Sequence, residues 1–254
     1  MRLEDPFTWT QRHQFTMATA VLATEDATAP VVPTVTMSPL IVQTLLYLAQ
    51  NSWTAPYPET DDRPMPQAEL RCHRITLVPL IEEHLDYEIE LDSDPDVMRY
   101  LGNGTARSRP EIEDAHRRRL TAATLIPGIG YWIGLVEDYF VGWWVLAAPE
   151  RPDQGTIEGQ AELGYRLLPR YWRQGLAGEG ARELLRHGFE DLGLTRIFAE
   201  TMSVNTASRT TMTSIGMEYV RTFHLQFEQP IPGTEHGEVE YAITTDQWRT
   251  NQPR

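Results

Sequence analysis

The chain contains no lysine, because all 22 of its basic residues are arginines. This absence excludes every mechanism that needs a lysine amine, including Schiff-base chemistry and the phosphate-binding lysine of P-loops. The 36 acidic residues outnumber the arginines and give a formal net charge of −14. Because affinity for nucleic acid comes largely from neutralising phosphates, we expect no nucleic-acid partner and favour a cationic or amine-bearing one.

Cysteine is almost absent as well. Cys72 stands alone, so no disulfide can form within the chain and a multi-cysteine metal site is excluded. The seven histidines are scattered along the sequence, and we therefore expect no metal.

The first residues lack the apolar core of a signal peptide. The apolar stretch at 39–49 is far shorter than the ~20 residues that a membrane span needs, so we expect a cytoplasmic protein without a membrane partner.

The composition changes near residue 67. Residues 1–67 are rich in Thr, Ala, Pro and Val, and one amphipathic helix pattern occurs at Leu40–Ala49. A segment rich in proline and aspartate follows and is typical of a linker. These features predict an N-terminal extension over 1–67, partly disordered or forming one helix, and a single folded domain over 68–254.

Residues after Glu69 show the alternation and helical spacing of an α/β (α+β) domain. The pattern predicts one strand over 69–80, a helix over 81–91 and a hairpin around Asp138. Ser108, followed three residues later by an acidic residue, has the spacing of a capping box and predicts a helix start.

Two side-chain clusters have simple structural explanations. The hairpin holds three tryptophans, Trp132, Trp143 and Trp144, and we expect at least two of them in the core rather than along a substrate channel. The run Arg117–Arg119 near the end of a predicted helix is expected to be solvated, since helix C-termini favour cations.

The turn Trp172–Gly178 follows a predicted strand and enters a helix. A helix N-terminus presents unpaired backbone N–H groups and partial positive charge, which suits an anion. Gly175 and Gly178 permit close backbone approach, and Arg173 adds a charge-assisted contact. The turn is neither a P-loop nor a dinucleotide-binding GxGxxG motif.

The segment ELGYRLLPRYWRQGLAGEGARELLRHGF resembles the acetyl-CoA-binding motif of the GNAT superfamily of N-acetyltransferases, especially the branch of ribosomal-protein N-terminal acetyltransferases. The family pattern is Arg/Gln-x-x-Gly-x-Gly/Ala, and Gly175 and Ala177 match its last two fixed positions. Trp172 departs from the first position, although a Tyr-Trp pair is usual in this branch. The resemblance spans about 69–248 and implies a mixed, mostly antiparallel central sheet flanked by helices.

The resemblance also implies a function. Acetyl-CoA would be the cosubstrate, and a primary amine would attack its thioester directly. The acceptor would be a protein N-terminus or a small-molecule amine, and the protein would be a monomer or a homodimer. The alternative is a non-catalytic acyl-CoA-binding or regulatory module, because the tyrosine that many relatives carry at the position of Met212 is missing. The implied cofactor-binding residues are Leu167, Leu168, Arg173, Gln174, Gly175, Leu176, Ala177, Gly178 and Asn205.

Glu162 is the preferred general base, because its carboxylate could take the proton of the amine through a water. In a strand this carboxylate would lie on the face opposite to Tyr165. It could also be an ordinary solvated carboxylate or only a substrate contact. Glu200 is a second candidate, and Tyr165 could act in place of Glu162. By resemblance, Ser208 protonates the leaving thiolate. Asn205 could bind pantetheine, although capping a helix is enough to explain it.

Overall fold

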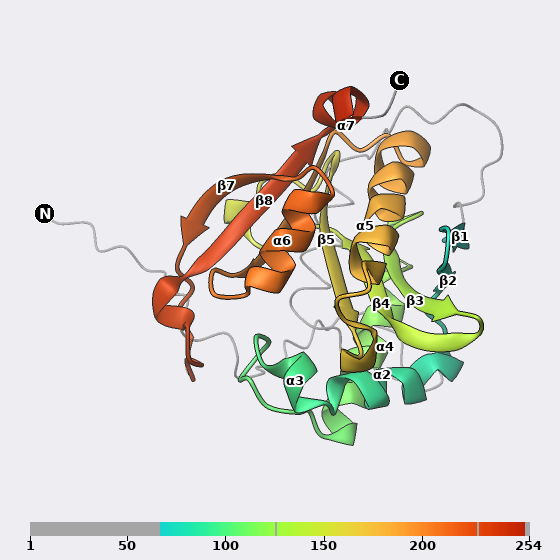
Figure 1. Ribbon diagram of the computed structural model, residues 1–254, viewed down its shortest axis with the longest axis vertical. Helices are drawn as coiled ribbons and strands as arrows, with labels where there is room; N and C mark the ends of the chain where they lie inside the picture. Colours follow the sequence, from blue (N-terminus) through green and yellow to red (C-terminus); the bar gives the residue numbers. More distant parts are fainter. Residues whose placement is uncertain (1–66, 125, 228, 252–254) are drawn as a thin grey trace, which may run out of the picture. The chain divides into compact units, whose positions relative to one another are not determined.

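The computed structural model describes residues 67–124, 126–227 and 229–251, in which eight strands form one sheet in the order β1-β2-β3-β4-β5-β6-β8-β7 (Figure 1). The strands are β1 (Leu70–Arg71), β2 (Thr76–Pro79), β3 (Gly130–Val136), β4 (Tyr139–Ala147), β5 (Gln160–Leu167), β6 (Arg196–Met202), β7 (Glu218–Phe223) and β8 (Glu238–Thr244). The helices are α2 (Leu85–Asp92), α3 (Pro95–Met98), α4 (Arg109–Ala122), α5 (Leu176–Arg186), α6 (Thr206–Ser214) and α7 (Thr245–Asn251). Among the described strands only β5 and β6 pair in parallel, so the predicted mixed, mostly antiparallel sheet is confirmed.

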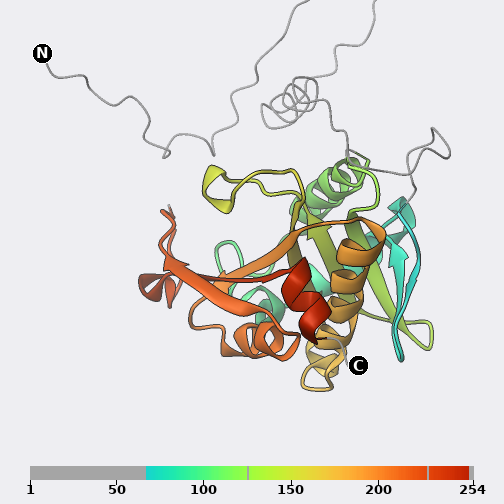
Figure 2. The same ribbon diagram turned by 90° about the horizontal axis from the view of Figure 1, so that it is seen from above.

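Helices cover both faces of the sheet. Helices α5 and α6 lie on one face, whereas α4 lies on the other (Figure 2). A large apolar core fills the space under α5 and includes Trp144, Leu184 and Ile197. A smaller core that includes Leu91 and Trp143 lies on the opposite face. Alternate residues of each central strand therefore face different layers, and this places polar side chains of one strand on a common face.

The three tryptophans of the β3–β4 hairpin lie in these cores. Trp132 and Trp144 are fully buried and Trp143 is nearly so, which confirms the expected packing role. The indole nitrogen of Trp144 donates to the carbonyl of Ala177, 3.1 Å away in α5. A Cβ added at Gly180 would lie 2.6 Å from the same indole ring. Helix α5 can therefore approach the sheet this closely only because residue 180 is glycine.

We expect Gly180→Ala to lower the free energy of unfolding by about 1–3 kcal/mol, because the buried indole cannot move away without overpacking the core. Urea unfolding of the two proteins measures this difference. Gly178→Ala is the matched control in the same helix, since a Cβ there meets nothing closer than 3.6 Å. Equal effects of the two substitutions would contradict the packing argument.

The segment 69–80 forms two strands rather than the single strand predicted. The backbone N–H of Cys72 donates to the carbonyl of Ile75 at 2.8 Å, and this turn reverses the chain between β1 and β2. Leu70 and Ile75, which a single strand would place on opposite faces, are both buried in the larger core. The predicted helix over 81–91 is present as a short 3₁₀ turn followed by α2. The capping box at Ser108 is confirmed, with its N–H 2.8 Å from the Glu111 carboxylate.

Arg119 corrects the expectation for the arginine run. The side chains of Arg117 and Arg118 are exposed as expected, but the guanidinium of Arg119 is buried. It contacts Glu88 at 2.5 Å and Asp92 at 3.3 Å, two carboxylates of α2. The helical period explains this, because residue 119 shares the inner face of α4 with buried residues one and two turns earlier.

Two further expectations concern the beginning of the chain. The predicted helix at Leu40–Ala49 and almost all of the predicted extension lie outside the described residues. Within the described part of the chain, no helix combines the length and apolar character needed to cross a bilayer.

Candidate functional site

The sheet opens between β5 and β6. The two strands pair only over Gln160–Glu162 and Arg196–Phe198, and in the described structure no registered pair follows. The N–H of Leu168 donates to Val141 of β4 at 3.0 Å, which fixes the pleat of β5. Because backbone groups alternate in direction along a strand, those of Tyr165 and Leu167 point away from β4 and into the gap.

Leu168 differs from its expected role. Its N–H is bonded to Val141, its carbonyl accepts from Tyr171 at 2.9 Å, and its side chain is buried. Both backbone groups of Leu168 are therefore already used within the protein. The carbonyl of Leu167 accepts from the indole nitrogen of Trp172 at 2.7 Å. The free strand edge thus consists of the Leu167 N–H and the backbone groups of Tyr165.

The turn before α5 has the geometry of an anion cradle. Gly175 has a φ of +79° and Arg173 a φ of +58°, and these two left-handed residues turn the chain into the helix. No side chain caps α5, so the N–H groups of its first turn, which begins at Leu176, lack a side-chain partner. The Arg173 side chain is exposed beside this turn.

Arg74 fastens this turn from a distant part of the chain. Its guanidinium donates to the carbonyl of Gln174 at 3.0 Å and to the carboxylate of Glu179 at 2.7 Å. The pairing neutralises an acidic side chain that would otherwise repel an anion at the helix N-terminus. Sequence reasoning missed Arg74, because it precedes Glu179 by 105 positions.

Glu162 lies on the expected face of β5. Ala161 and Leu163 are buried under α5, so the carboxylate points to the opposite side of the sheet. Burial, together with the negative charges of Glu200 and Glu150, raises the pKa of Glu162 to about 7, against weaker opposing effects of Arg151 and Gln154. The carboxyl group can therefore gain and lose a proton near neutral pH.

Glu200 is held differently. Both of its carboxylate oxygens accept from Arg151, at 2.7 and 2.6 Å, and one of them also accepts from Gln154 at 3.2 Å. Glu162, in contrast, has no arginine partner among the described residues, and its Oε2 accepts only from Gln154, at 3.1 Å. Arg151 and Gln154 belong to the polar loop between β4 and β5, which sequence reasoning passed over because it shows no periodicity.

Ser208 and Tyr165 meet on the other face of the sheet. The phenol oxygen of Tyr165 lies 3.3 Å from the Ser208 hydroxyl and 3.2 Å from its carbonyl oxygen. Burial raises the pKa of Tyr165 above its ordinary value. The phenol therefore stays protonated at neutral pH, which disfavours it as a replacement for Glu162 as the base. Met212, where many relatives carry tyrosine, is buried in the core.

Asn205 caps α6. Its amide oxygen accepts from the N–H of Ser208 at 3.2 Å, and its amide nitrogen donates to Thr201 at 3.1 Å. Both ends of the side chain are used within the protein, and capping therefore accounts for the residue.

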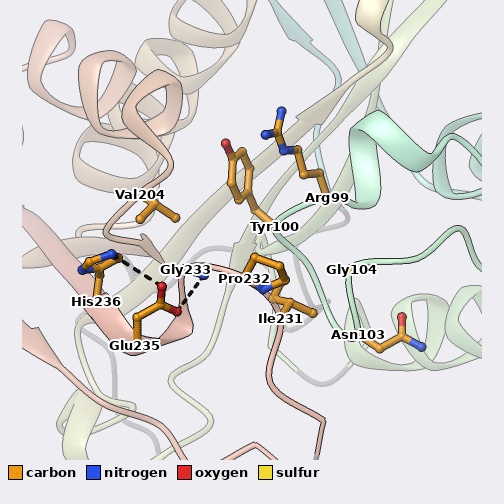
Figure 3. Close-up of a pocket in the computed structure, with 10 residues that line it drawn as sticks. All are labelled: Arg99, Tyr100, Asn103, Gly104, Val204, Ile231, Pro232, Gly233, Glu235 and His236. Atoms are coloured by element: carbon orange, nitrogen blue, oxygen red, sulfur yellow. Dashed lines mark hydrogen bonds and ion pairs between the residues drawn. The ribbon is translucent and has the colours of Figure 1, made fainter.

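A pocket of about 560 Å³ opens beyond the end of β6, and no pattern in the sequence predicted it (Figure 3). Three segments form its walls: the loop after α3, the turn before α6 and the loop before β8. Glu235 folds back onto the N–H of Gly233 at 2.9 Å, while Arg99 and Tyr100 project from the opposite wall. The lining residues are Arg99, Tyr100, Asn103, Gly104, Val204, Ile231, Pro232, Gly233, Glu235 and His236.

Comparison with known proteins agrees with this geometry. Residues 74–218 match the family model described as an acetyltransferase (GNAT) domain. A protein of Aspergillus fumigatus named FsC-acetyl coenzyme A-N(2)-transacetylase is 42% identical over 185 residues, covering 72% of this chain and 78% of that protein. An uncharacterized N-acetyltransferase of Bacillus subtilis, YoaA, is 37% identical over 157 residues, covering 59% of this chain and 82% of that protein.

Solved structures share the fold at low identity. A ribosomal L7/L12 alpha-N-protein acetyltransferase in complex with coenzyme A is similar with a TM-score of 0.59 at 14% identity, covering 71% of this chain and 99% of that one. A spermidine N-acetyltransferase from Vibrio cholerae, in complex with CoA and spermine, gives 0.57 at 17% identity, covering 69% and 98%.

The family match and the named relative support an enzyme rather than the non-catalytic module considered as the alternative. The gap in the sheet, the uncapped turn at α5 and the matched domain lead to one conclusion. The chain belongs to the GNAT family of acetyltransferases, and acetyl-CoA is its acetyl donor.

Proposed function

We propose that this enzyme acetylates a primary amine by direct attack of the amine on the thioester, with Glu162 as the general base. One observation carries the proposal. A half-buried carboxylate that has no arginine partner in the described structure, with a pKa raised to about 7, stands where β5 and β6 begin to separate. A base poised near the working pH removes an amine proton efficiently.

The donor would be held mainly by backbone groups. The N–H groups of Leu176, Ala177 and Gly178 suit the pyrophosphate, and the exposed guanidinium of Arg173 adds charge. In the gap, the Leu167 N–H and the backbone of Tyr165 would pair with the amides of the pantetheine arm, as an added strand does. Gln174 contributes indirectly, because its carbonyl accepts a hydrogen bond from Arg74 and this bond helps to hold the turn in place.

Two proton transfers accompany the reaction. Glu162 accepts a proton from the attacking nitrogen as the new C–N bond forms. The C–S bond then breaks, and the thiolate takes a proton from the Ser208 hydroxyl, which Tyr165 can replenish across 3.3 Å. Because a thiol of pKa ~8.5 is already a fair leaving group, this second transfer contributes less than the first.

The acceptor that we favour is a small molecule with an amine at its 2-position. The relative at 42% identity is named as an N(2)-transacetylase. Glu238, on the same face as Glu162, is buried and has no ion-pair partner in the described structure, and burial together with Glu200 raises its pKa. Two such carboxylates suit a cationic acceptor. The pocket beyond β6 offers space for the rest of the molecule.

A protein N-terminal amine is the second candidate. The Tyr171-Trp172 pair and Ser208 resemble the ribosomal-protein branch, and a structure of that activity shares the fold. An N-terminal α-amine is also a primary amine, but it belongs to a larger molecule. The residues proposed for the reaction would therefore serve either acceptor and do not distinguish between the two.

The test measures thiol release from acetyl-CoA with 2-amino small molecules and with N-terminal peptides. We expect the small molecules to give the higher kcat/KM, and a preference for peptides would favour the second candidate. Failure of every primary amine, with acetyl-CoA still bound in calorimetry, would overturn the proposal.

Ser208→Ala should lower kcat about tenfold without changing the KM for acetyl-CoA, since it removes only the weaker proton transfer. Steady-state kinetics of the purified variant measure both constants. Ser214→Ala is the control on the same helix, because that exposed hydroxyl bonds only the carbonyl of Thr211. An unchanged kcat in Ser208→Ala would remove Ser208 from the mechanism.

A further inference from the structure

The loop between β4 and β5 places one buried amide side chain between two carboxylates. Gln154, which is 4% exposed, ends the 3₁₀ turn Pro152–Gln154. Its Oε1 accepts from the backbone N–H groups of Glu150 at 2.8 Å and Arg151 at 2.9 Å. Because both of those groups are donors, the amide can have only one orientation, with its nitrogen toward the carboxylates.

Both hydrogens of this nitrogen are used. Nε2 donates to Oε2 of Glu162 at 3.1 Å and to Oε2 of Glu200 at 3.2 Å. The two carboxylates are thus joined through a neutral donor instead of facing each other directly. Carboxylates that share a site directly do not ionise independently, since one of them retains a proton.

The loop that carries Gln154 is itself fastened. Arg151 holds Glu200 and also contacts Asp153 at 3.1 Å. Arg221 of β7 contacts Asp153 at 2.8 Å, and its guanidinium also pairs with Glu240 of β8 at 2.6 Å. The position of the Gln154 amide is therefore set by ion pairs from its loop to β6 and β7, and Arg221 links the second of these to β8, before any substrate arrives.

One oxygen of Glu162 remains available. Oε2 is occupied by Gln154, whereas Oε1 has no hydrogen-bond partner among the described residues. In that part of the chain, the only fully buried unpartnered side-chain atoms are His116 Nε2 and Trp143 Nε1. Glu162 is itself only half-buried, and Oε1 is the oxygen of its carboxylate that has no donor in the described structure, so it is the one best placed to accept a proton.

We propose that Gln154 is a positioning residue, which holds Oε2 of Glu162 so that Oε1 faces the acceptor amine, and which keeps Glu162 and Glu200 from sharing a proton. This inference rests on the proposed role of Glu162 as the base. The charged groups around Glu162 are Glu150 and Glu200, which disfavour its ionised form, and Arg151, which favours it. Of its neighbours, Gln154 is the one that bonds it directly.

Gln154→Glu is the sharpest test, because the new side chain has nearly the same shape. One oxygen of the new carboxylate can still accept from the two backbone N–H groups. Its other oxygen takes the place of the amide nitrogen, so a charged acceptor replaces the two hydrogen-bond donors that faced Glu162 and Glu200. We expect the acid limb of the kcat/KM profile against pH to move upward from about 7 by about one unit or more. Activity near pH 7 should fall about tenfold and recover at higher pH, with unchanged acetyl-CoA binding in calorimetry.

Gln247→Glu is the matched control. Gln247 also accepts from a backbone N–H, that of Thr244 at 2.8 Å, and donates to a carboxylate, that of Glu218 at 2.9 Å. It lies on α7, away from Glu162, and its variant should keep the wild-type profile. If Gln154→Glu does not fold, Gln154→Met removes the donors without adding charge and should move the limb in the same direction.

Three outcomes decide the matter. A raised acid limb in the Gln154 variants alone supports the inference. An unmoved limb, even with a uniformly lower rate, would leave Gln154 a structural residue only and overturn it. Wild-type kinetics in Glu162→Gln would instead overturn the proposed base itself, and the role of Gln154 with it.

Discussion

Glu162→Gln is expected to lower kcat by a factor of about 10²–10⁴ while the KM for acetyl-CoA stays the same. The amide keeps the size of the carboxylate and can still accept from Gln154, but it cannot take a proton from an amine. Steady-state thiol release measures both constants. In the wild type, the rate should rise with pH through about 7, because the base must be ionised to act.

The same substitution should stabilise the fold at alkaline pH. A carboxyl group with a folded-state pKa of about 7, against an ordinary value of 4.5, binds its proton more tightly in the folded chain. Stability therefore falls as pH rises from 4.5 through 7, by about 3 kcal/mol in all. Glu162→Gln avoids this cost at pH 8, so urea unfolding should show a higher free energy of unfolding.

Glu158→Gln serves as the control for both measurements, because Glu158 is an exposed carboxylate in the neighbouring loop. It should change neither kcat nor stability. A Glu162→Gln enzyme that kept most of its kcat would remove Glu162 as the base. A variant without added stability at pH 8 would contradict the raised pKa.

Arg119→Met should lower the free energy of unfolding by about 3–5 kcal/mol, which approaches the whole stability of many domains. The guanidinium is buried between Glu88 and Asp92, whose side chains are fully buried as well. It also lies over the ring of Trp143, 5.3 Å from its centroid. Methionine fills similar space but leaves two buried carboxylates short of positive charge.

Arg118→Met is the neighbouring control on the same helix. The Arg118 side chain is 60% exposed, and its partner Asp114 is exposed too, so the change should stay within about 0.5 kcal/mol. Urea unfolding at pH 7 compares the two variants. A loss in Arg119→Met as small as that in Arg118→Met would show that the buried carboxylates find compensation elsewhere, for example in His116, 2.7 Å from Glu88, or in Arg166, 2.5 Å from Asp92.

Local signals in the sequence predicted much of what surrounds the site. The left-handed Gly175 before α5 and the alternation that turns Glu162 away from α5 both depend on neighbours within a few residues. Such patterns are visible because helices and strands impose their own short periods on the chain. The burial of Arg119 could have been predicted in the same way, since the helical period places it beside buried positions of α4.

Other features arise only when distant segments meet. Gln154 and Glu200 are 46 positions apart, and the loop that holds Gln154 has no period that would mark its inward side chain. The turn between β1 and β2 passes through His73 and Arg74. It lacks the glycine, proline or asparagine by which turns are usually predicted from a sequence. Polar contacts of this kind follow from the fold as a whole rather than from any local preference.

The short pairing of β5 with β6 has a mechanical meaning. The joint consists of three residue pairs, whereas β6 and β8 are joined by seven. The sheet is therefore two half-sheets that share a narrow seam, and Glu162, the proposed base, lies in the last residue pair of this seam. A donor whose amides pair along β5 would complete the ladder there. Each turnover would then add one temporary strand to the sheet when the donor binds and remove it when the product leaves. The gap beside β5 would thus close and reopen once in each catalytic cycle.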